Sequence, residues 1–456
     1  MSKTIKIALL MAASLFMEIL DGTIVTTALP KIGVTFNRSA ATTALLVSVY
    51  LITVAVFIPL SGWLAHRFGK KIIWLSAVAL FTASSLGSAL APTFTILLAM
   101  RLLQGVAGSL MTPTARLIVL EKTEPSQLLR MVSYLVWPAL IAPAIAPVLG
   151  GFIITYWSWH WIFFINLPIG IVILAIGTWW LAPDQHNTAQ PFDWMGFLEI
   201  AASSILILVG AEAATRTNAN WRLSSALVII GLLGIGLVGY HLSHAAQPLF
   251  AVTALKTASF RICQTGGSLL WLSVGALPYL LTVYLQTIFG WAAVKAGGFV
   301  LFIFVGNIGI KPFTTIIIQK LSYRGALLAA FLMVLVSGVA LAFIRENTAA
   351  PIIALLAMVA GMGRSLALTA YNGLSFAEIA PQDRNSANTL SAVVQTMAQG
   401  LGVSLITVVV HVISMYTALA TAYEYGFAIL GLLMLFPILE VWGLPKTLGN
   451  ATLSAS

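Results

Sequence analysis

The sequence predicts an all-α integral membrane protein. Of its 456 residues, 60% are hydrophobic and only 8% are charged, whereas about 25% of the residues in an average soluble domain are charged. Apolar segments of about 20 residues follow one another along the chain, and a helix of that length crosses a hydrocarbon core of about 30 Å. The strands of a membrane barrel would be shorter and would alternate apolar and polar residues. These observations favour a bundle of membrane-spanning helices.

Fourteen segments are apolar and long enough to span the bilayer. An even number of spans places both ends of the chain on one side of the membrane. The longest polar stretches, residues 183–194 and 214–222, are only about ten residues each, which leaves no room for a soluble domain. In chain order, the predicted spans are residues 7–29, 41–65, 72–91, 94–118, 131–156, 161–182, 195–213, 223–243, 262–289, 294–318, 326–344, 351–376, 386–414 and 422–443.

The basic residues predict the orientation of these spans. With the amino terminus inside, cytoplasmic segments hold 13 Lys and Arg residues, outer loops hold six and the spans hold four, which together account for all 23. Because inner loops of membrane proteins are enriched in Lys and Arg, both termini are predicted to be cytoplasmic. The formal net charge of +10 is scattered over short loops. Anionic lipid headgroups are therefore better partners for it than nucleic acid.

Several classes of function are disfavoured by the residues present. Cys263 is the single cysteine, which excludes an intramolecular disulfide and supplies no metal cluster. The first span carries Glu18 and Asp21 and is too long for the apolar core of a cleaved signal peptide. The sequence shows no hydrolase elbow, phosphate-binding glycine loop or metal-ligand cluster. We therefore expect neither an enzyme nor direct ATP drive, and no cofactor.

Charged side chains inside the apolar spans are candidate functional residues, because an ionised Asp at the centre of a membrane helix costs about 3 kcal/mol. Glu18 and Asp21 are three residues apart and so share a helix face. Arg101, in the fourth span, needs carboxylates, carbonyls or water beside it, so Asp21 or Glu18 is its expected partner. Burial raises the pKa of a carboxyl group and a neighbouring guanidinium lowers it, so a balanced carboxyl can load and release a proton near neutral pH. The alternative is a purely structural ion pair.

A basic turn after the second span has a blurred echo half a chain later. The two segments are residues 62–71 and 319–325. An internal repeat of this kind is typical of secondary transporters, whose substrate site lies near the bilayer midplane where the two halves meet.

Five strings of residues resemble the major facilitator superfamily, in particular its fourteen-span drug:proton antiporter branch. Residues 20–30 resemble the signature of that branch, and residues 62–71 resemble the inter-helix loop of the superfamily. Residues 101–108 resemble the fourth-helix motif with its intramembrane Arg, residues 138–151 the antiporter motif, and residues 159–170 a further branch-specific string. Within the branch, the chain is most similar to the enterobacterial multidrug-transporter-like subgroup, many of whose members have no assigned substrate.

The resemblance implies a major facilitator fold of two six-helix bundles, residues 1–182 and 261–456, joined by two additional transmembrane helices within residues 183–260. It also implies a monomer in the bacterial inner membrane, driven by the proton gradient and in contact with lipid. Three residues depart from the family pattern: His66 replaces an Asp of the loop, His160 replaces an Arg, and Ala146 replaces a Gly. Because a histidine can change charge near neutral pH, His66 predicts a weaker or pH-sensitive inner latch.

The resemblance and the residue types together assign candidate roles. Asp21, Glu18 and Arg101 are the predicted proton-coupling residues. The predicted gate and hinge residues, for which topology and helix packing are the alternatives, are Gly62, His66, Arg67, Gly69, Lys70, Lys71, Pro143, Pro147, Gly150 and Gly151. The predicted substrate-binding residues, for which hydrogen bonding between helices is the alternative, are Glu18, Asp21, Tyr279, Gln286, Asn307, Lys311, Arg364, Asn372 and Gln395.

The favoured hypothesis is a proton-coupled exporter of amphipathic, cationic drugs or biocides that works by alternating access, because acids and aromatic side chains suit such cargo. The first rival is an exporter of an endogenous anionic metabolite, which Lys311 and Arg364 support. The second rival is a membrane scaffold or sensor that transports nothing.

Overall fold

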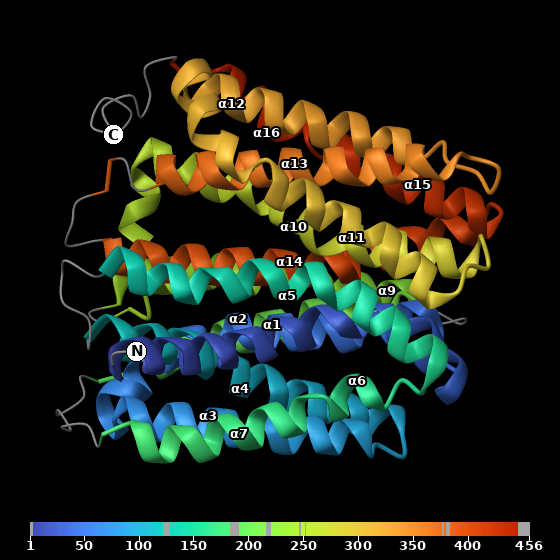
Figure 1. The fold of residues 1–456 in the computed structure, drawn as a ribbon. Helices are drawn as coiled ribbons and strands as arrows, with labels where there is room; N and C mark the ends of the chain where they lie inside the picture. The colour runs from blue at the N-terminus through green and yellow to red at the C-terminus, as the bar shows by residue number, and fades with distance from the viewer. Residues whose placement is uncertain are drawn as a thin grey trace.

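A computed structural model describes residues 3–121, 128–182, 191–215, 220–245, 248–250, 252–375, 378–379 and 384–445. The secondary structure in these ranges is entirely helical, as predicted. Figure 1 shows the long helices running side by side in one bundle, coloured from blue at the amino terminus to red near the carboxyl terminus.

The first part of the bundle contains α1 (Lys3–Phe36), α2 (Ala40–Phe68), α3 (Lys70–Ala89), α4 (Phe94–Glu121), α5 (Leu128–Tyr156), α6 (Trp161–Phe164) and α7 (Asn166–Trp180). The middle part contains α8 (Trp194–Ala213), α9 (Trp221–His244) and the 3-10 helix η2 (Val252–Lys256). The last part contains α10 (Ala258–Thr287), α11 (Ala293–Gly309), α12 (Lys311–Leu341), α13 (Ala350–Ser375), α14 (Arg384–Ser414), α15 (Leu419–Leu432) and α16 (Leu435–Trp442).

The predicted number of spans agrees with the structure. Twelve described helices or helix pairs are long and apolar enough to cross a membrane. Two shorter apolar helical stretches, Ile141–Tyr156 within α5 and Ala293–Gly309 in α11, bring the number to fourteen.

The tenth and eleventh spans differ in detail from the prediction. A single span was expected over residues 294–318, but α11 ends at Gly309 and α12 begins at Lys311. Pro312, in the first turn of α12, lacks a backbone N–H and favours the start of a new helix there. The predicted turn at residues 319–325 is confirmed: Ser322 is non-helical, with a φ of 59° that is uncommon outside glycine, and it divides α12 into two helical segments.

Local sequence explains several helix ends. The Ser39 side chain accepts a hydrogen bond from the Thr42 N–H at 3.2 Å and so caps α2. Asp193 caps α8 in the same way through the Gly196 N–H at 2.9 Å. Gly69, with a φ of 90°, joins α2 to α3 in a conformation that a residue with a side chain rarely adopts.

Two helix pairs connect the first part of the bundle to the last part. α2 packs along α14, and α5 packs against α11. Within each part, α1 packs against α5, and α12 against α13, while α8 and α9 pack mainly against each other. The domain boundaries at residues 182/183 and 260/261 stay a prediction.

Polar contacts between the two parts lie near the end of the bundle that carries residues 37–39, which we call the distal end. Gln286 donates to the Thr27 carbonyl at 3.3 Å, and Tyr279 donates to the Ala40 carbonyl at 3.3 Å. The Val294 N–H donates to Thr155 Oγ1 at 3.2 Å. These bonds seal the first and last parts against each other at the distal end.

The α5–α11 contact depends on glycine. A Cβ on Gly297 would lie 2.0 Å from the Pro147 carbonyl oxygen, whereas a Cβ on Gly298 would meet nothing within 4 Å. We expect Gly297→Ala to weaken the distal seal and to destabilise the fold by about 1–3 kcal/mol through overpacking. The measurement is the distance between spin labels at Tyr156 and Lys295, which should increase. Gly298→Ala is the matched control, and equal distances in the two variants would contradict the prediction.

Candidate functional site

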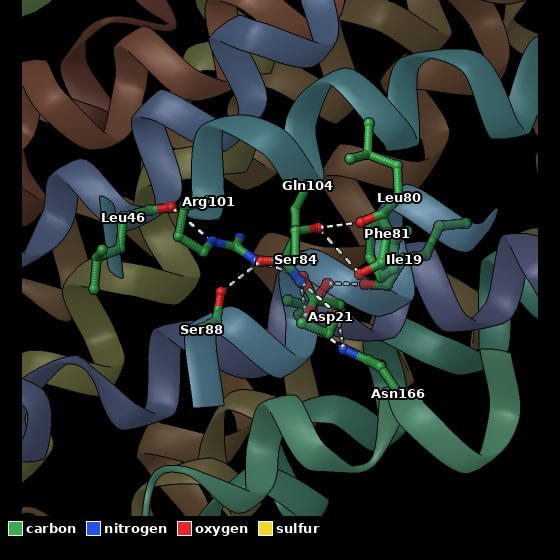
Figure 2. Close-up of polar contacts among 12 residues, drawn as sticks. Ile19, Asp21, Leu46, Leu80, Phe81, Ser84, Ser88, Arg101, Gln104 and Asn166 are labelled. Atoms are coloured by element: carbon green, nitrogen blue, oxygen red, sulfur yellow. Dashed lines mark hydrogen bonds and ion pairs between the residues drawn. The ribbon is translucent and has the colours of Figure 1, made fainter. Parts of the chain in front are cut away.

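Asp21 is the centre of a buried polar network between α1, α4 and α7. Its side chain is 0% exposed, and its Oδ2 atom pairs with Arg101 Nη1 at 2.5 Å. Its Oδ1 atom accepts hydrogen bonds from Asn166 Nδ2 at 2.7 Å and from Gln104 Nε2 at 3.3 Å. Figure 2 shows Arg101, Gln104 and Asn166 directed at Asp21 from two helices. Both carboxylate oxygens of Asp21 therefore have partners.

Arg101 is held by more than this ion pair. Its Nε donates to the Leu46 carbonyl of α2 at 3.1 Å, and its Nη1 also donates to Gln104 Oε1 at 2.9 Å. The guanidinium lies over the Tyr50 ring at 4.3 Å from its centroid, a favourable cation–π geometry. Arg101 thus connects α1, α2 and α4, and of its two expected partners the structure selects Asp21.

Serine side chains of α3 complete the network. Gln104 Nε2 donates to Ser85 Oγ at 2.8 Å, and Ser88 Oγ donates to Gln104 Oε1 at 3.4 Å. The sequence analysis did not single out Ser85, Tyr50 or Asn166 as site residues. Each of these residues places a polar side chain inside an apolar span, which is the feature that could have identified it. Polar side chains are common in membrane helices, however, and the sequence does not show which groups they contact.

Glu18 lies one turn from Asp21 in a different environment. Its Oε2 atom accepts a hydrogen bond from Thr112 Oγ1 at 2.6 Å, and the residue retains 8% exposure. A Cβ on Gly108 would lie 3.3 Å from Glu18 Oε1 and 3.2 Å from the Tyr50 hydroxyl, so both groups approach α4 at this glycine. Among the described residues, no cation forms an ion pair with Glu18 within 4 Å. Glu18 therefore has fewer polar contacts with other protein groups than Asp21 has.

The predicted gate loop lies at the junction of α2 and α3. His66 and Arg67 are exposed, and the Arg67 guanidinium lies 5.4 Å from the Trp63 ring centroid. Lys71 Nζ donates to the Thr178 carbonyl at 3.1 Å and also to the Leu181 carbonyl. Because carbonyls at a helix C-terminus attract cations, Lys71 braces α3 against the end of α7. Gly62 has open space around it, and Gly69 forms the turn itself.

The predicted hinge residues lie in α5. Pro147 is buried and Pro143 is partly buried. A Cβ on Gly150 would lie 2.2 Å from Thr27 Oγ1, and one on Gly151 would lie 2.5 Å from the Ala293 carbonyl oxygen. Both glycines therefore permit close helix contact, Gly150 with α1 and Gly151 with the start of α11.

The predicted cargo residues do not form one cluster. Tyr279 and Gln286 belong to the distal seal described above. Asn307 is partly buried on α11 beside Gly361, Gln395 is partly buried on α14, and Asn372 is exposed on α13.

Lys311 and Arg364 lie in the last part of the bundle. Lys311 Nζ donates to Thr369 Oγ1 at 3.1 Å, and Arg364 lines a small cavity between α10, α11, α12 and α13. The Arg364 Nε atom is buried without a hydrogen-bond partner. Over the ranges that the structure describes, neither cation has a carboxylate within 4 Å. The carboxyl groups of the candidate site, Asp21 and Glu18, therefore lie in the first part of the bundle. Lys311 and Arg364, the cations without a carboxylate partner, lie in the last part.

His160, which stands where the related branch has an Arg, stacks on Trp159 with 3.8 Å between ring centroids. Its Nδ1 atom lies 3.2 Å from Ser158 Oγ. Burial lowers the pKa of His160 below its usual value. This corner therefore carries less positive charge at pH 7 than an Arg would supply.

A bundle of fourteen spans, with a buried carboxylate–guanidinium pair inside the first six, defines a multi-pass membrane transporter. The chain belongs to the Major Facilitator Superfamily, whose family model matches residues 11–407. A relative named "Putative multidrug resistance protein MdtD", from Pectobacterium carotovorum subsp. carotovorum (strain PC1), is 32% identical over 87% of this chain and 85% of its own. The protein of the same name from Serratia proteamaculans (strain 568) is 29% identical over 98% of this chain and 94% of its own.

Solved transporter structures share the fold at low sequence identity. An auto-inhibited POT family peptide transporter has a TM-score of 0.71 at 14% identity, covering 96% of this chain and 97% of its own. A D-xylose-proton symporter has a TM-score of 0.68 at 15% identity, covering 98% of this chain and 99% of its own. These two likenesses establish the architecture and say nothing of the cargo.

Proposed function

We propose that this transporter is a proton-coupled exporter of amphipathic, cationic drugs or biocides and that it works by alternating access. The relatives named as multidrug resistance proteins support a multidrug-type transporter. The observation that carries the proposal is the pair of acids one helical turn apart: Asp21 has both oxygens occupied, whereas Glu18 has a single side-chain hydrogen bond.

These contacts favour a division of roles between the two acids. Asp21 is paired with Arg101 and bonded directly to α4 and α7, and Arg101 in turn donates to α2. Protonation of Asp21 would therefore release Arg101 and loosen the contacts among α1, α2 and α4. Glu18 needs to exchange only one hydroxyl contact to meet a cation or a proton. In the proposed cycle, Glu18 receives cargo or proton, and the Asp21–Arg101 pair transmits that change to the helix packing.

The direction of transport is part of the proposal. Hydrogen bonds join the two parts of the bundle at the distal end, which is the periplasmic side if both termini are cytoplasmic as proposed. Cargo would enter from the cytoplasm or inner leaflet of a bacterial inner membrane in another state of the alternating-access cycle. The protein would act as a monomer, with the proton gradient as its energy source.

A different observation supports a second class of cargo, an anionic metabolite. Lys311 and Arg364 have no carboxylate partner among the described side chains, and an unpaired guanidinium in a low-dielectric interior is costly. An anionic cargo would supply the missing charge. Export of an anionic metabolite is therefore the alternative that the test must separate.

The test is substrate-evoked proton movement in proteoliposomes with an imposed pH gradient. A lipophilic cation and an amphipathic anion of similar size are added in parallel, with Asp21→Asn and Glu18→Gln as variants. Proton movement evoked by the cation and lost in both variants supports the proposal. Proton movement that only the anion evokes, and that is lost in Arg364→Gln, would instead support export of an anionic metabolite. If no compound in a panel of both classes evokes proton movement, the hypothesis of a membrane scaffold or sensor would be favoured.

A further inference from the structure

The two helices between the first and last parts of the bundle cover the seam where α2 and α14 meet. α8 packs against α2 of the first part and against α14 of the last part, and its most extensive contact is with α9. α9 packs mainly against α8 and also touches η2. The hairpin formed by α8 and α9 therefore bridges the α2–α14 seam.

A buried apolar cluster lies between this hairpin and the seam. On α8 it contains Phe197 and Ile200, which are 7% and 4% exposed. The two seam helices contribute Ile52, Val56 and Leu60 from α2, and Ala387, Leu390 and Val393 from α14. The α2 residues lie in the middle and last thirds of that helix, which starts at the distal end, and the α14 residues lie in its first third. The cluster therefore lies between the middle of the bundle and the end opposite the distal end, which we call the proximal end.

Aromatic rings join the start of α8 to α2 in the first part of the bundle. The Trp63 ring centroid lies 5.5 Å from that of Phe192 and 6.0 Å from that of Trp194. Deeper in the bundle, Phe57 meets Phe197 edge to face at 5.1 Å. Tilted and edge-to-face arrangements are favourable for aromatic rings. The first turns of α8 are thus attached to the part of α2 that leads into the predicted gate loop.

The carboxylate between Phe192 and Trp194 bonds in the other direction. Asp193 Oδ2 accepts a hydrogen bond from the Leu249 N–H at 3.3 Å, and Asp193 Oδ1 lies 2.9 Å from His241 Nε2 on α9. Leu249 comes just before η2, which packs against α10 and α14 of the last part. Three consecutive residues, 192–194, therefore contact the first part through two rings and, through one carboxylate, the segment that leads into the last part.

We propose that the α8–α9 hairpin is a clamp that holds the proximal ends of α2 and α14 together in this conformation. Because α8 contacts both helices, their separation at the proximal end would pull α8 away from at least one of them. Apolar side chains of the cluster would then face the water that fills the opening, which is unfavourable. The role of this clamp in transport rests on the proposed alternating access, but the clamp itself can be measured without cargo or a pH gradient.

The test is the distance between two spin labels at the proximal end of the full-length protein in lipid. The labels are placed at Ile72, exposed at the start of α3, and at Arg261, exposed at the start of α10, after replacement of the single cysteine by Cys263→Ser. In the double variant Trp194→Ala with Phe197→Ala, the fraction of molecules at longer distances should rise several-fold. An unchanged distance distribution in this variant would overturn the proposal.

The matched control is Ile205→Ala, which truncates an apolar side chain of α8 that is 57% exposed. This variant should keep the distance distribution of the parent protein. If it lengthens the distances as much as the double variant does, general loosening of α8 rather than release of the seam explains the effect, and the clamp is rejected.

A second variant tests the polar attachment and keeps the proposal testable if the double variant does not fold. Asp193→Ala releases Leu249 and His241 but leaves the aromatic rings in place, so it should also lengthen the distances. Its control is Ser225→Ala, which removes an exposed hydroxyl that bonds only within α9. Unchanged distances in Asp193→Ala would contradict the polar attachment. Neither result depends on proton movement, so the clamp can fail while the proposed exporter stands, and the reverse is equally visible.

Discussion

Arg101→Ala is expected to abolish transport and to destabilise the fold by about 3–5 kcal/mol, the usual cost of breaking a buried ion pair by removing one partner. The substitution would leave the Asp21 carboxylate fully buried with only amide donors from Asn166 and Gln104. It would also release the Leu46 carbonyl of α2 and the ring face of Tyr50. The measurement is thermal unfolding in detergent beside transport in proteoliposomes.

Two further variants test whether the uncompensated charge of Asp21, rather than lost packing, causes the instability of Arg101→Ala. Arg222→Ala removes an exposed arginine from α9 and should leave unfolding within about 0.5 kcal/mol of the wild type. The double variant Asp21→Asn with Arg101→Gln removes both charges, so it should recover more than half of the lost stability while remaining inactive. If the double variant is as unstable as Arg101→Ala, lost packing rather than an uncompensated charge explains the effect.

Glu18→Gln is expected to abolish cargo-evoked proton movement while preserving the fold. Gln has nearly the same shape and can still accept a hydrogen bond from Thr112, so the stability should change by less than about 1 kcal/mol. A hydrogen bond to a charged group contributes about 1.5–3 kcal/mol, so binding of a lipophilic cation should weaken by roughly tenfold or more. The measurements are cation binding in detergent and proton movement in proteoliposomes.

Asp21→Asn separates the two proposed roles. Because Asp21 has both oxygens occupied by protein groups, its neutral variant should bind the cation nearly as well as the wild type does but fail to couple binding to proton movement. Its unfolding temperature should also fall, since Arg101 loses its partner. Loss of cation binding in Asp21→Asn with full binding in Glu18→Gln would reverse the assignment of the two acids.

Hydropathy and charge along the chain predicted the helical class, the number of spans and the connecting turns. These properties depend on neighbouring residues, because the bilayer selects each span by its length and apolar content. The same reasoning placed Glu18 and Asp21 on one helix face and predicted a carboxylate partner for Arg101. It merged α11 with the start of α12, because hydropathy does not register the helix break just before Pro312, whereas the turn that contains Ser322 was predicted.

The sequence by itself thus determined that this protein is a multi-span transporter with charges inside its first and last parts. The tertiary structure alone decided which charges meet. Arg101 pairs with Asp21 and not with Glu18, and Lys311 and Arg364 are without acids in the described ranges. Helical spacing gives the face on which a side chain lies, but its partners come from helices 80 or more residues away in sequence, as for Asp21 and Arg101. Those partners depend on the depth and rotation of each packed helix.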